Sequence, residues 1–259
     1  MARQRRNESA TGYYHVMMRG INREFLFRLD VDKHHFLELV KEQQAKGFIE
    51  LVAWCLMNNH VHMIVKAEVA ALSKAVKILS LKYSAYYNRG QRRVGPVFGD
   101  RFRSENIEDD GYLLGALRYI HMNPVKAQLA KDPADYEWSS FGEYLGESMY
   151  IDQGQKDFVL GLFGKNVASF AQFHAQVDDD RYLETREDAD KYREELAASV
   201  LEGFCNELGV TSAKEIQSSP ELLEEISRRL VQDVGLSLRK AAGLLETTHN
   251  RVYQALQDE

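Results

Sequence analysis

The 259-residue sequence predicts an α+β domain with a ferredoxin-like antiparallel sheet and helices, followed by an all-α C-terminal module. Strand-like and helix-like segments in the first half of the chain occur in the order β-α-β-β-α-β, the order of a ferredoxin-like sandwich. Residues 191–259 instead carry helical periodicity throughout. We therefore expect a domain over residues 1–148, an acidic helical connector over 149–190 and a helical module over 191–259.

The first strand and the first helix each end at a glycine. Residues 13–18 read as a strand that ends at Arg19 and Gly20. Residues 31–46 carry apolar side chains at helical spacing, and Gly47 is the stop signal of that helix.

A hairpin and a long helix come next. Residues 48–57 and 60–67 read as the second and third strands. The Asn58-Asn59 junction between them predicts a hairpin turn, because asparagine tolerates a positive φ. Residues 69–88 predict a helix with one apolar face and lysines elsewhere, and Gly90 breaks the chain after it.

The fourth strand and the last long helix complete the predicted order. Residues 98–107 read as the strand. Asp109 and Asp110 open the helix, because carboxylates favour its positive end, and Pro124 closes it. Residues 138–148 are expected to complete the domain.

Composition indicates a soluble globular protein, with 44% hydrophobic and 28% charged residues. Cys55 and Cys205 are too few for a disulfide framework or a thiolate cluster, which favours the reducing cytosol and hence a cytoplasmic protein. The basic start of the chain runs into Asn7-Glu8-Ser9 and not into an apolar segment, so we expect no signal peptide. No stretch is long enough for a membrane span, so we expect no membrane partner.

Charge is unevenly distributed along the chain. Residues 1–150 carry 21 Lys and Arg against 18 Asp and Glu, whereas residues 151–259 carry 12 against 21. Residues 66–103 alone have a net charge of +7, which fits either a phosphate-binding surface or a solvated helix face followed by a loop. The candidate phosphate contacts in this stretch are Lys74, Lys77, Lys82, Arg89, Arg92, Arg93, Arg101 and Arg103.

The end of the chain, residues 237–257, is similar to a helix-turn-helix. Ser237 would cap the first helix. His249, Asn250 and Arg251 would begin the second helix, where such motifs read base edges. The alternative is an ordinary helical hairpin used for packing or dimerisation.

His60-Val61-His62 is the most informative motif of the chain. On a strand, alternation places both imidazoles on one face. Two such imidazoles can hold a divalent metal ion and leave coordination positions open for a phosphate and a third ligand. The alternative is a pair of buried strand histidines that satisfy each other or the backbone.

A tyrosine-bearing helix face follows about sixty residues later. Tyr112, Ala116, Tyr119 and Asn123 are spaced so that they share one face of the helix that opens at Asp109. Tyrosine is a poor nucleophile at its usual pKa near 10, and a metal that polarises a phosphate lowers the demand on it. From spacing alone, four other tyrosines compete with Tyr119 for this role: Tyr83, Tyr86, Tyr87 and Tyr112.

The chain resembles the HUH single-tyrosine transposases, and more narrowly the branch associated with repetitive extragenic palindromes (REP). The resemblance is carried by the order and separation of two motifs, residues 59–65 and residues 118–126. The resemblance extends to Tyr14-His15-Val16, to residues 98–102 and to Trp138-Ser139-Ser140. It therefore covers about residues 11–148. The acidic C-terminal part departs from the simplest members, which end soon after the tyrosine domain.

The resemblance implies strand transfer on single-stranded DNA at palindromic hairpin elements. His60 and His62 would bind Mg²⁺ or Mn²⁺, with Asn123 as the third, oxygen-donating ligand. Tyr119 would attack a backbone phosphate to form a 5′-phosphotyrosine and free a 3′-hydroxyl. The C-terminal module would contact duplex DNA, a partner protein or a second copy of the chain, and both a monomer and a homodimer with exchanged tyrosine helices remain open.

Three other functions are compatible with parts of the pattern. A histidine-triad hydrolase requires a third histidine where Ile64 stands, so the motif does not match. An HUH replication initiator or relaxase shares the two histidines and the tyrosine, but the short domain and the Asn-Pro ending after Tyr119 favour the transposase. A domesticated DNA-binding regulator would bind duplex DNA without cleaving it.

Overall fold

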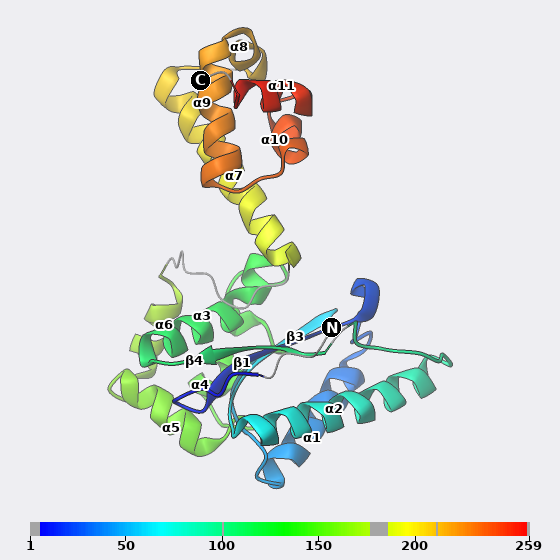
Figure 1. Ribbon diagram of the computed structural model, residues 1–259. Coiled ribbons are helices and arrows are strands. Elements are labelled where there is room, and N and C mark those ends of the chain that lie inside the picture. Colours follow the sequence, from blue (N-terminus) through cyan, green and yellow to red (C-terminus); the bar gives the residue numbers. More distant parts are fainter. Residues whose placement is uncertain (1–5, 100, 177–185, 211, 258–259) are drawn as a thin grey trace. The chain divides into compact units, whose positions relative to one another are not determined.

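The computed structural model describes residues 6–99, 101–176, 186–210 and 212–257 (Figure 1). The chain forms two compact units, residues 1–183 and residues 184–259. Among the described residues, no helix has both the length and the apolar character that crossing a bilayer requires.

The first unit is built on a four-stranded antiparallel sheet with the strand order β2-β3-β1-β4. This order confirms the predicted ferredoxin-like topology. The strands are β1 (Tyr13–Arg19), β2 (Glu50–Met57), β3 (His60–Lys66) and β4 (Arg103–Ile107).

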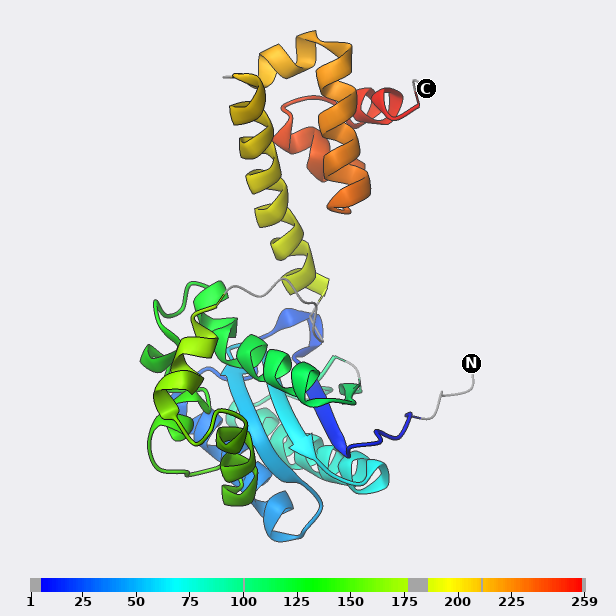
Figure 2. The same cartoon turned by 90° about the vertical axis from the view of Figure 1, so that its left-hand side faces the viewer.

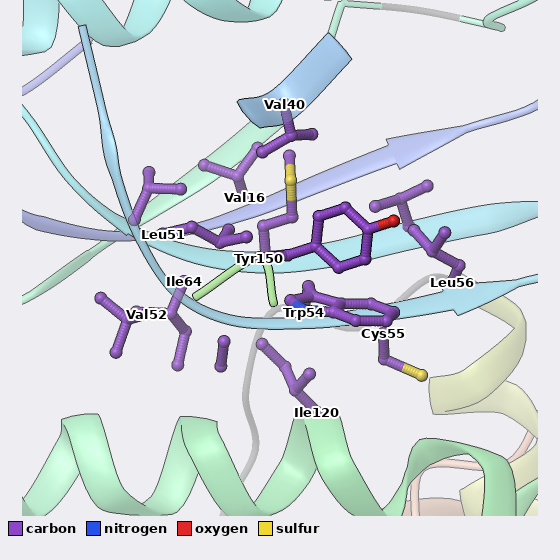
Figure 3. Packing of buried hydrophobic residues seen from close by; sticks show 14 of the residues in the cluster. Val16, Val40, Leu51, Val52, Trp54, Cys55, Leu56, Ile64, Ile120 and Tyr150 are labelled. Carbon is purple, nitrogen blue, oxygen red and sulfur yellow. The ribbon is translucent and has the colours of Figure 1, made fainter. Parts of the chain in front are cut away.

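Helices cover both faces of this sheet (Figure 2). The helices α1 (Asp30–Ala45) and α2 (Val69–Gly90) pack on one face, and α3 (Asp110–Lys126) crosses the other. Figure 3 shows both layers of the core, with Val16 and Val40 on one side of the sheet and Ile64 and Ile120 on the other. Because successive side chains of a strand alternate between faces, the sequence assigns each strand residue to one of these two layers.

The predicted hairpin turn is present at Asn58-Asn59, but neither asparagine has a positive φ, so the conformation expected for this turn is wrong. The turn is held by the segment that follows β1. The backbone N–H groups of Leu26 and Phe27 donate to the Asn58 carbonyl at 2.7 and 3.1 Å, and Gly20 N–H donates to the Asn59 carbonyl at 2.9 Å. These bonds fasten residues 20–27 beside the first residue of β3.

Two predicted boundaries differ from the structure. The fourth strand begins at Arg103 and not at residue 98, because residues 97–99 pair with the end of β1 and the turn after it through a Gly20–Phe98 bridge. Helix α3 continues past Pro124 to Lys126. Proline removes one hydrogen bond of the last turn, but the Ala127 N–H still donates to the Asn123 carbonyl at 2.9 Å.

The core of the first unit continues beyond the predicted boundary at residue 148. After η1 (Ile21–Arg23) and η2 (Pro133–Asp135), the unit adds α4 (Phe141–Leu145), α5 (Gln153–Leu162) and α6 (Val167–His174). Val159 and Phe170 are fully buried in the same core as the sheet, so residues 149–174 are part of the domain and not a connector. The sequence Asp178-Asp179-Asp180, which by its acidic composition predicts a solvated break, lies outside the described residues.

The second unit is all-α, as predicted, and has its own core. Phe204, Ile226, Leu230, Leu245 and Val252 are buried there. Its elements are α7 (Arg186–Leu208), which runs across the boundary predicted at residue 190, α8 (Ala213–Ser218), α9 (Pro220–Arg228), the π-helical η3 (Arg229–Asp233), α10 (Leu238–Leu244) and α11 (His249–Ala255).

Candidate active site

The β1–β3 register gathers polar side chains on the sheet face that α3 covers. Arg19 lies opposite His60, and His15 lies opposite Ile64, two residue pairs along the strands from His62. Cross-strand partners share a face, so His15, Arg19, His60 and His62 all lie on this side. The centroids of the His60 and His62 rings are 5.1 Å apart, as expected for a strand pair two residues apart.

Helix α3 brings Tyr119 to these histidines. Asp109 caps the helix by accepting from Tyr112 N–H. The Tyr119 ring is buried, with its centroid 5.6 Å from that of His62 and 6.0 Å from that of His15. Asn123 lies one turn further along the same helix and is also buried. The predicted nucleophile and the two predicted imidazole ligands are therefore neighbours.

Hydrogen bonding orients the His60 ring. His60 Nδ1 lies 2.7 Å from the side-chain oxygen Oδ1 of Asn59. Since an amide oxygen only accepts, Nδ1 carries the proton and Nε2 keeps its lone pair. A neutral imidazole in this tautomer is a competent metal ligand through Nε2.

His15 is a buried neighbour of the site to which the sequence assigned no role. Its Nε2 lies 3.0 Å from His62 Nδ1. Burial lowers the pKa of His15 to about 3. Burial, followed by the charges of His60 and His15, holds the pKa of His62 well below its usual value. Both imidazoles are therefore neutral near neutral pH, so each ring has one nitrogen lone pair, and one of these two lone pairs accepts the hydrogen bond between the rings.

Lys126 is a second residue near Tyr119, the predicted nucleophile, to which the sequence assigned no role. Its Nζ lies 5.1 Å from the centre of the Tyr119 ring. The spacing of Tyr119, Asn123 and Lys126, four residues and then three, could have placed it on this helix face. The ammonium group thus makes a cation–π contact with this ring.

The metal-ligand set can be tested against the polar atoms that the site presents. His62 Nε2 is buried and has no hydrogen-bond partner among the described residues, as expected of a nitrogen that awaits a ligand. No cluster of three or more His, Cys, Asp or Glu side chains that could hold a metal occurs in the described part of the chain. Two imidazoles and the amide oxygen of Asn123 would suit Mg²⁺ or Mn²⁺, so the donors present fit the implied metal.

The three competing tyrosines of α2 lie in the opposite layer and have structural contacts. Tyr83 and Tyr87 donate to the backbone carbonyls of Leu26 and Phe25 at 2.5 and 2.7 Å. Tyr86 donates to a carboxylate oxygen of Asp32 at 2.9 Å. Only Tyr112 and Tyr119, among the five tyrosines considered, come from the helix over the histidines.

The basic residues predicted to contact phosphate are divided between the two layers. Lys74, Lys77 and Lys82 project from α2, on the side of the sheet away from the histidines. Lys74 lies 4.4 Å from the Phe48 ring, Lys82 pairs with Glu42, and Arg93 pairs with Glu24. Arg89 and Arg92 are exposed at and just beyond the end of α2.

The basic residues on the β4 side stand closer to the histidines. Arg103 lies opposite Met17 in the β1–β4 register and so shares the histidine face, with Arg101 two residues before it. The structure thus brings Arg103, but not the α2 lysines, to the candidate site.

His121 makes structural contacts behind α3. Its Nδ1 lies 2.9 Å from His174 Nε2, and its Nε2 lies 2.8 Å from Ser140 Oγ. All three side chains are buried. This chain of hydrogen bonds ties α3 to α6 and, through Ser140 and the backbone of Trp54, to β2.

The helix-turn-helix-like segment consists of α10 and α11, capped by Ser237 and Thr248. His249 and Asn250 are exposed at the start of α11. Arg251, in contrast, donates to the Gln217 carbonyl at 2.7 Å and thus supports the packing of α8. Within the part of the chain that the structure describes, no such hydrogen bond is found for the side chains of His249 and Asn250.

Comparison with known proteins identifies similar chains. Residues 8–123 match a family model described as "Transposase IS200 like". A protein of Haemophilus influenzae described as a "Putative REP-associated tyrosine transposase" is 28% identical over 112 residues, which are 39% of this chain and 64% of that protein. The chain thus spans less than two thirds of that relative.

A solved structure, described as a REP-associated tyrosine transposase bound to a REP hairpin, is also similar. It is 20% identical, with a TM-score of 0.48, over 58% of this chain and 88% of that one.

Proposed function

We propose that this chain is a metal-dependent transposase that cleaves and rejoins single-stranded DNA at palindromic hairpin elements. The match of residues 8–123 to the model of IS200-like transposases supports this proposal. The observation that carries the proposal is the position of Tyr119, whose ring lies 5.6 Å from that of His62 beneath α3. A buried tyrosine beside the imidazoles of His60 and His62 would combine a nucleophile with metal ligands.

The proposed metal ion is Mg²⁺ or Mn²⁺, held by His60, His62 and Asn123. When bound, it would act as a Lewis acid that polarises the phosphate. His60 supports this assignment because its bond to Asn59 leaves Nε2 available. The buried Nε2 of His62 supports it equally.

The proposed reaction exchanges one phosphate ester for another. The Tyr119 oxygen bonds to phosphorus while the bond from phosphorus to the 3′ oxygen breaks. The phenol loses its proton, and the departing oxygen takes one up to become a 3′-hydroxyl. Lys126 would favour the phenolate. The 5′-phosphotyrosine conserves the ester energy, so attack by a 3′-hydroxyl rejoins strands without another cofactor.

Substitution of the two tyrosines on α3 tests the nucleophile. We expect Tyr119→Phe to abolish covalent capture of a hairpin oligonucleotide with single-stranded flanks, while binding of the oligonucleotide survives. Tyr112→Phe on the same helix is the matched control and should leave capture intact. Denaturing gel electrophoresis measures the covalent complex. Capture that persists in Tyr119→Phe and disappears in Tyr112→Phe would transfer the nucleophile to Tyr112.

Chelation tests the metal separately. Excess chelator should stop cleavage and leave the circular dichroism spectrum and thermal midpoint of the protein unchanged, since the sheet and core form without the ion. Cleavage that continues in excess chelator would overturn the ligand roles of His60, His62 and Asn123.

A second candidate function is duplex DNA binding by α10 and α11, which the exposure of His249 and Asn250 at the start of α11 favours. We expect the double substitution of these residues by alanine to weaken binding to a labelled duplex about 10-fold or more in fluorescence anisotropy. Gln257→Ala, beyond the end of α11, is the control. If the double variant binds the duplex with unchanged affinity, α10 and α11 do not read DNA through these residues and serve as packing helices. A regulator without enzymatic activity would bind duplex and never form the Tyr119 adduct.

A further inference from the structure

His15 is the residue of the site that the proposed chemistry leaves without a role. It lies on β1, its side chain is fully buried, and its Nε2 is 3.0 Å from His62 Nδ1. We propose that His15 is a positioning residue, which accepts a hydrogen bond from His62 Nδ1–H and so holds the His62 ring with its Nε2 lone pair available to a divalent metal ion. This inference rests on the proposed function, because the hydrogen bond is proposed to prepare His62 for metal binding.

The direction of the bond depends on which ring carries the shared proton. A hydrogen bond between two neutral imidazoles contains one proton, so either His15 or His62 donates. If His15 donated, the remaining N–H would be at His62 Nε2, and if His62 donates, it is at His15 Nδ1. Both of these nitrogens are buried without a hydrogen-bond partner among the described residues, so their surroundings select the direction. If His62 donates, its Nε2 carries a lone pair that a metal ion can satisfy.

The position of Glu105 favours donation by His62. It lies directly opposite His15 in the β1–β4 register, and its Oε2 is buried without a hydrogen-bond partner in the described part of the chain. Because Nε2 of His15 is engaged with His62, a carboxylate on the neighbouring strand favours the His15 proton on Nδ1. Glu105 would then orient His15, and His15 would orient His62. Metal-binding histidines are commonly oriented in this way by groups that do not themselves contact the metal.

Binding of Mn²⁺ to the full-length chain, measured by isothermal titration calorimetry, tests the inference without requiring activity. His15→Leu removes the acceptor and should weaken Mn²⁺ binding about 10–100-fold. His15→Gln supplies an amide oxygen as acceptor and should recover most of that loss. His174→Gln, in the buried histidine pair behind α3, is the control and should bind as the wild type does. A folded His15→Leu variant with wild-type affinity would overturn the inference.

The tautomer of His62 in the metal-free protein provides a readout that does not depend on the proposed function. Imidazole ¹⁵N spectra of the wild type should show a protonated Nδ1 and an unprotonated Nε2 at His62. The His15→Leu variant should show a mixture of both tautomers. A protonated Nε2 in the wild type would overturn the inference even if Mn²⁺ binds. A wild-type chain that binds no Mn²⁺ but has the expected tautomer would overturn the metal site and leave the His15–His62 bond standing.

Discussion

At the residue scale, the His121–His174 pair makes the stability of the first unit depend on pH. Burial, with a smaller contribution from the Arg118 charge, lowers the pKa of His174 from 6.5 to about 4. The unfolded chain therefore binds a proton between these values that the folded chain does not, so stability falls as the pH drops from about 6.5 towards 4.

Substitution of His174 isolates this contribution. Between about pH 7.5 and pH 5, the pKa change predicts a loss of about 2 kcal/mol in the free energy of unfolding from His174 alone. The glutamine of His174→Gln does not titrate. Over the same pH range, the free energy of unfolding of this variant should therefore fall by about 2 kcal/mol less than that of the wild type. Urea unfolding at the two pH values measures both. If the stability of the variant has the same pH dependence as that of the wild type, the lowered pKa of His174 is not the cause.

Sequence reasoning was most successful for single residues whose neighbours are close in the chain. The placement of His60 and His62 on one face follows from strand alternation, and that of Tyr119 beside Asn123 follows from helix spacing. His15 was missed as a site residue because its relation to His62 depends on the β1–β3 register, which no local periodicity specifies.

At the element scale, the segment after β1 is packed too tightly to accept a side chain at Gly20. A Cβ there would lie 2.1 Å from the Glu24 carbonyl oxygen, although its φ of −63° is ordinary. This segment is bonded to the Asn58-Asn59 turn that leads into His60. Its geometry therefore bears on the position of His60, the proposed metal ligand.

We expect Gly20→Ala to destabilise the protein by about 1–3 kcal/mol, as other overpacking changes do, and to weaken Mn²⁺ binding through His60. Gly90→Ala at the end of α2 is the control, because its added Cβ meets nothing within 4 Å, and it should be neutral or slightly stabilising. Chemical denaturation and calorimetry measure the two effects. Equal stability of the two variants would show that the segment relaxes without cost.

Element identities were predicted better than the layer each element occupies. The helix over residues 69–88 was expected and is present as α2, but its lysines lie across the sheet from the histidines. A run of positive charge indicates that a segment can bind phosphate. It does not indicate which face of the sheet the segment covers. The roles of Lys74, Lys77 and Lys82 in DNA binding remain predictions.

At the scale of the whole molecule, the extent of the first unit decides which truncated chains fold. Val159 and Phe170, both 0% exposed, belong to its core, and His174 bonds to α3. The sequence placed the boundary at residue 148 because the motifs end there. Acidic composition obscured the apolar positions of α5 and α6, which complete the core.

We expect a chain that ends after residue 183 to unfold cooperatively and to retain covalent capture of DNA. A chain that ends after residue 148 should lose cooperative unfolding, since removal of α5 and α6 exposes apolar core surface. Thermal unfolding followed by circular dichroism distinguishes the two. A cooperative transition at an unchanged midpoint in the shorter chain would contradict the domain extent described above.

The central claim is that Tyr119 and the histidine pair together perform strand transfer. Its most direct measurement is mass spectrometry of the covalent protein–DNA complex after proteolysis and nuclease digestion. We predict a nucleotide attached through its 5′-phosphate to Tyr119, in the peptide from α3, with the adduct absent when metal is withheld. An adduct on another residue, a 3′-phosphate linkage, or equal yield without metal would contradict the claim.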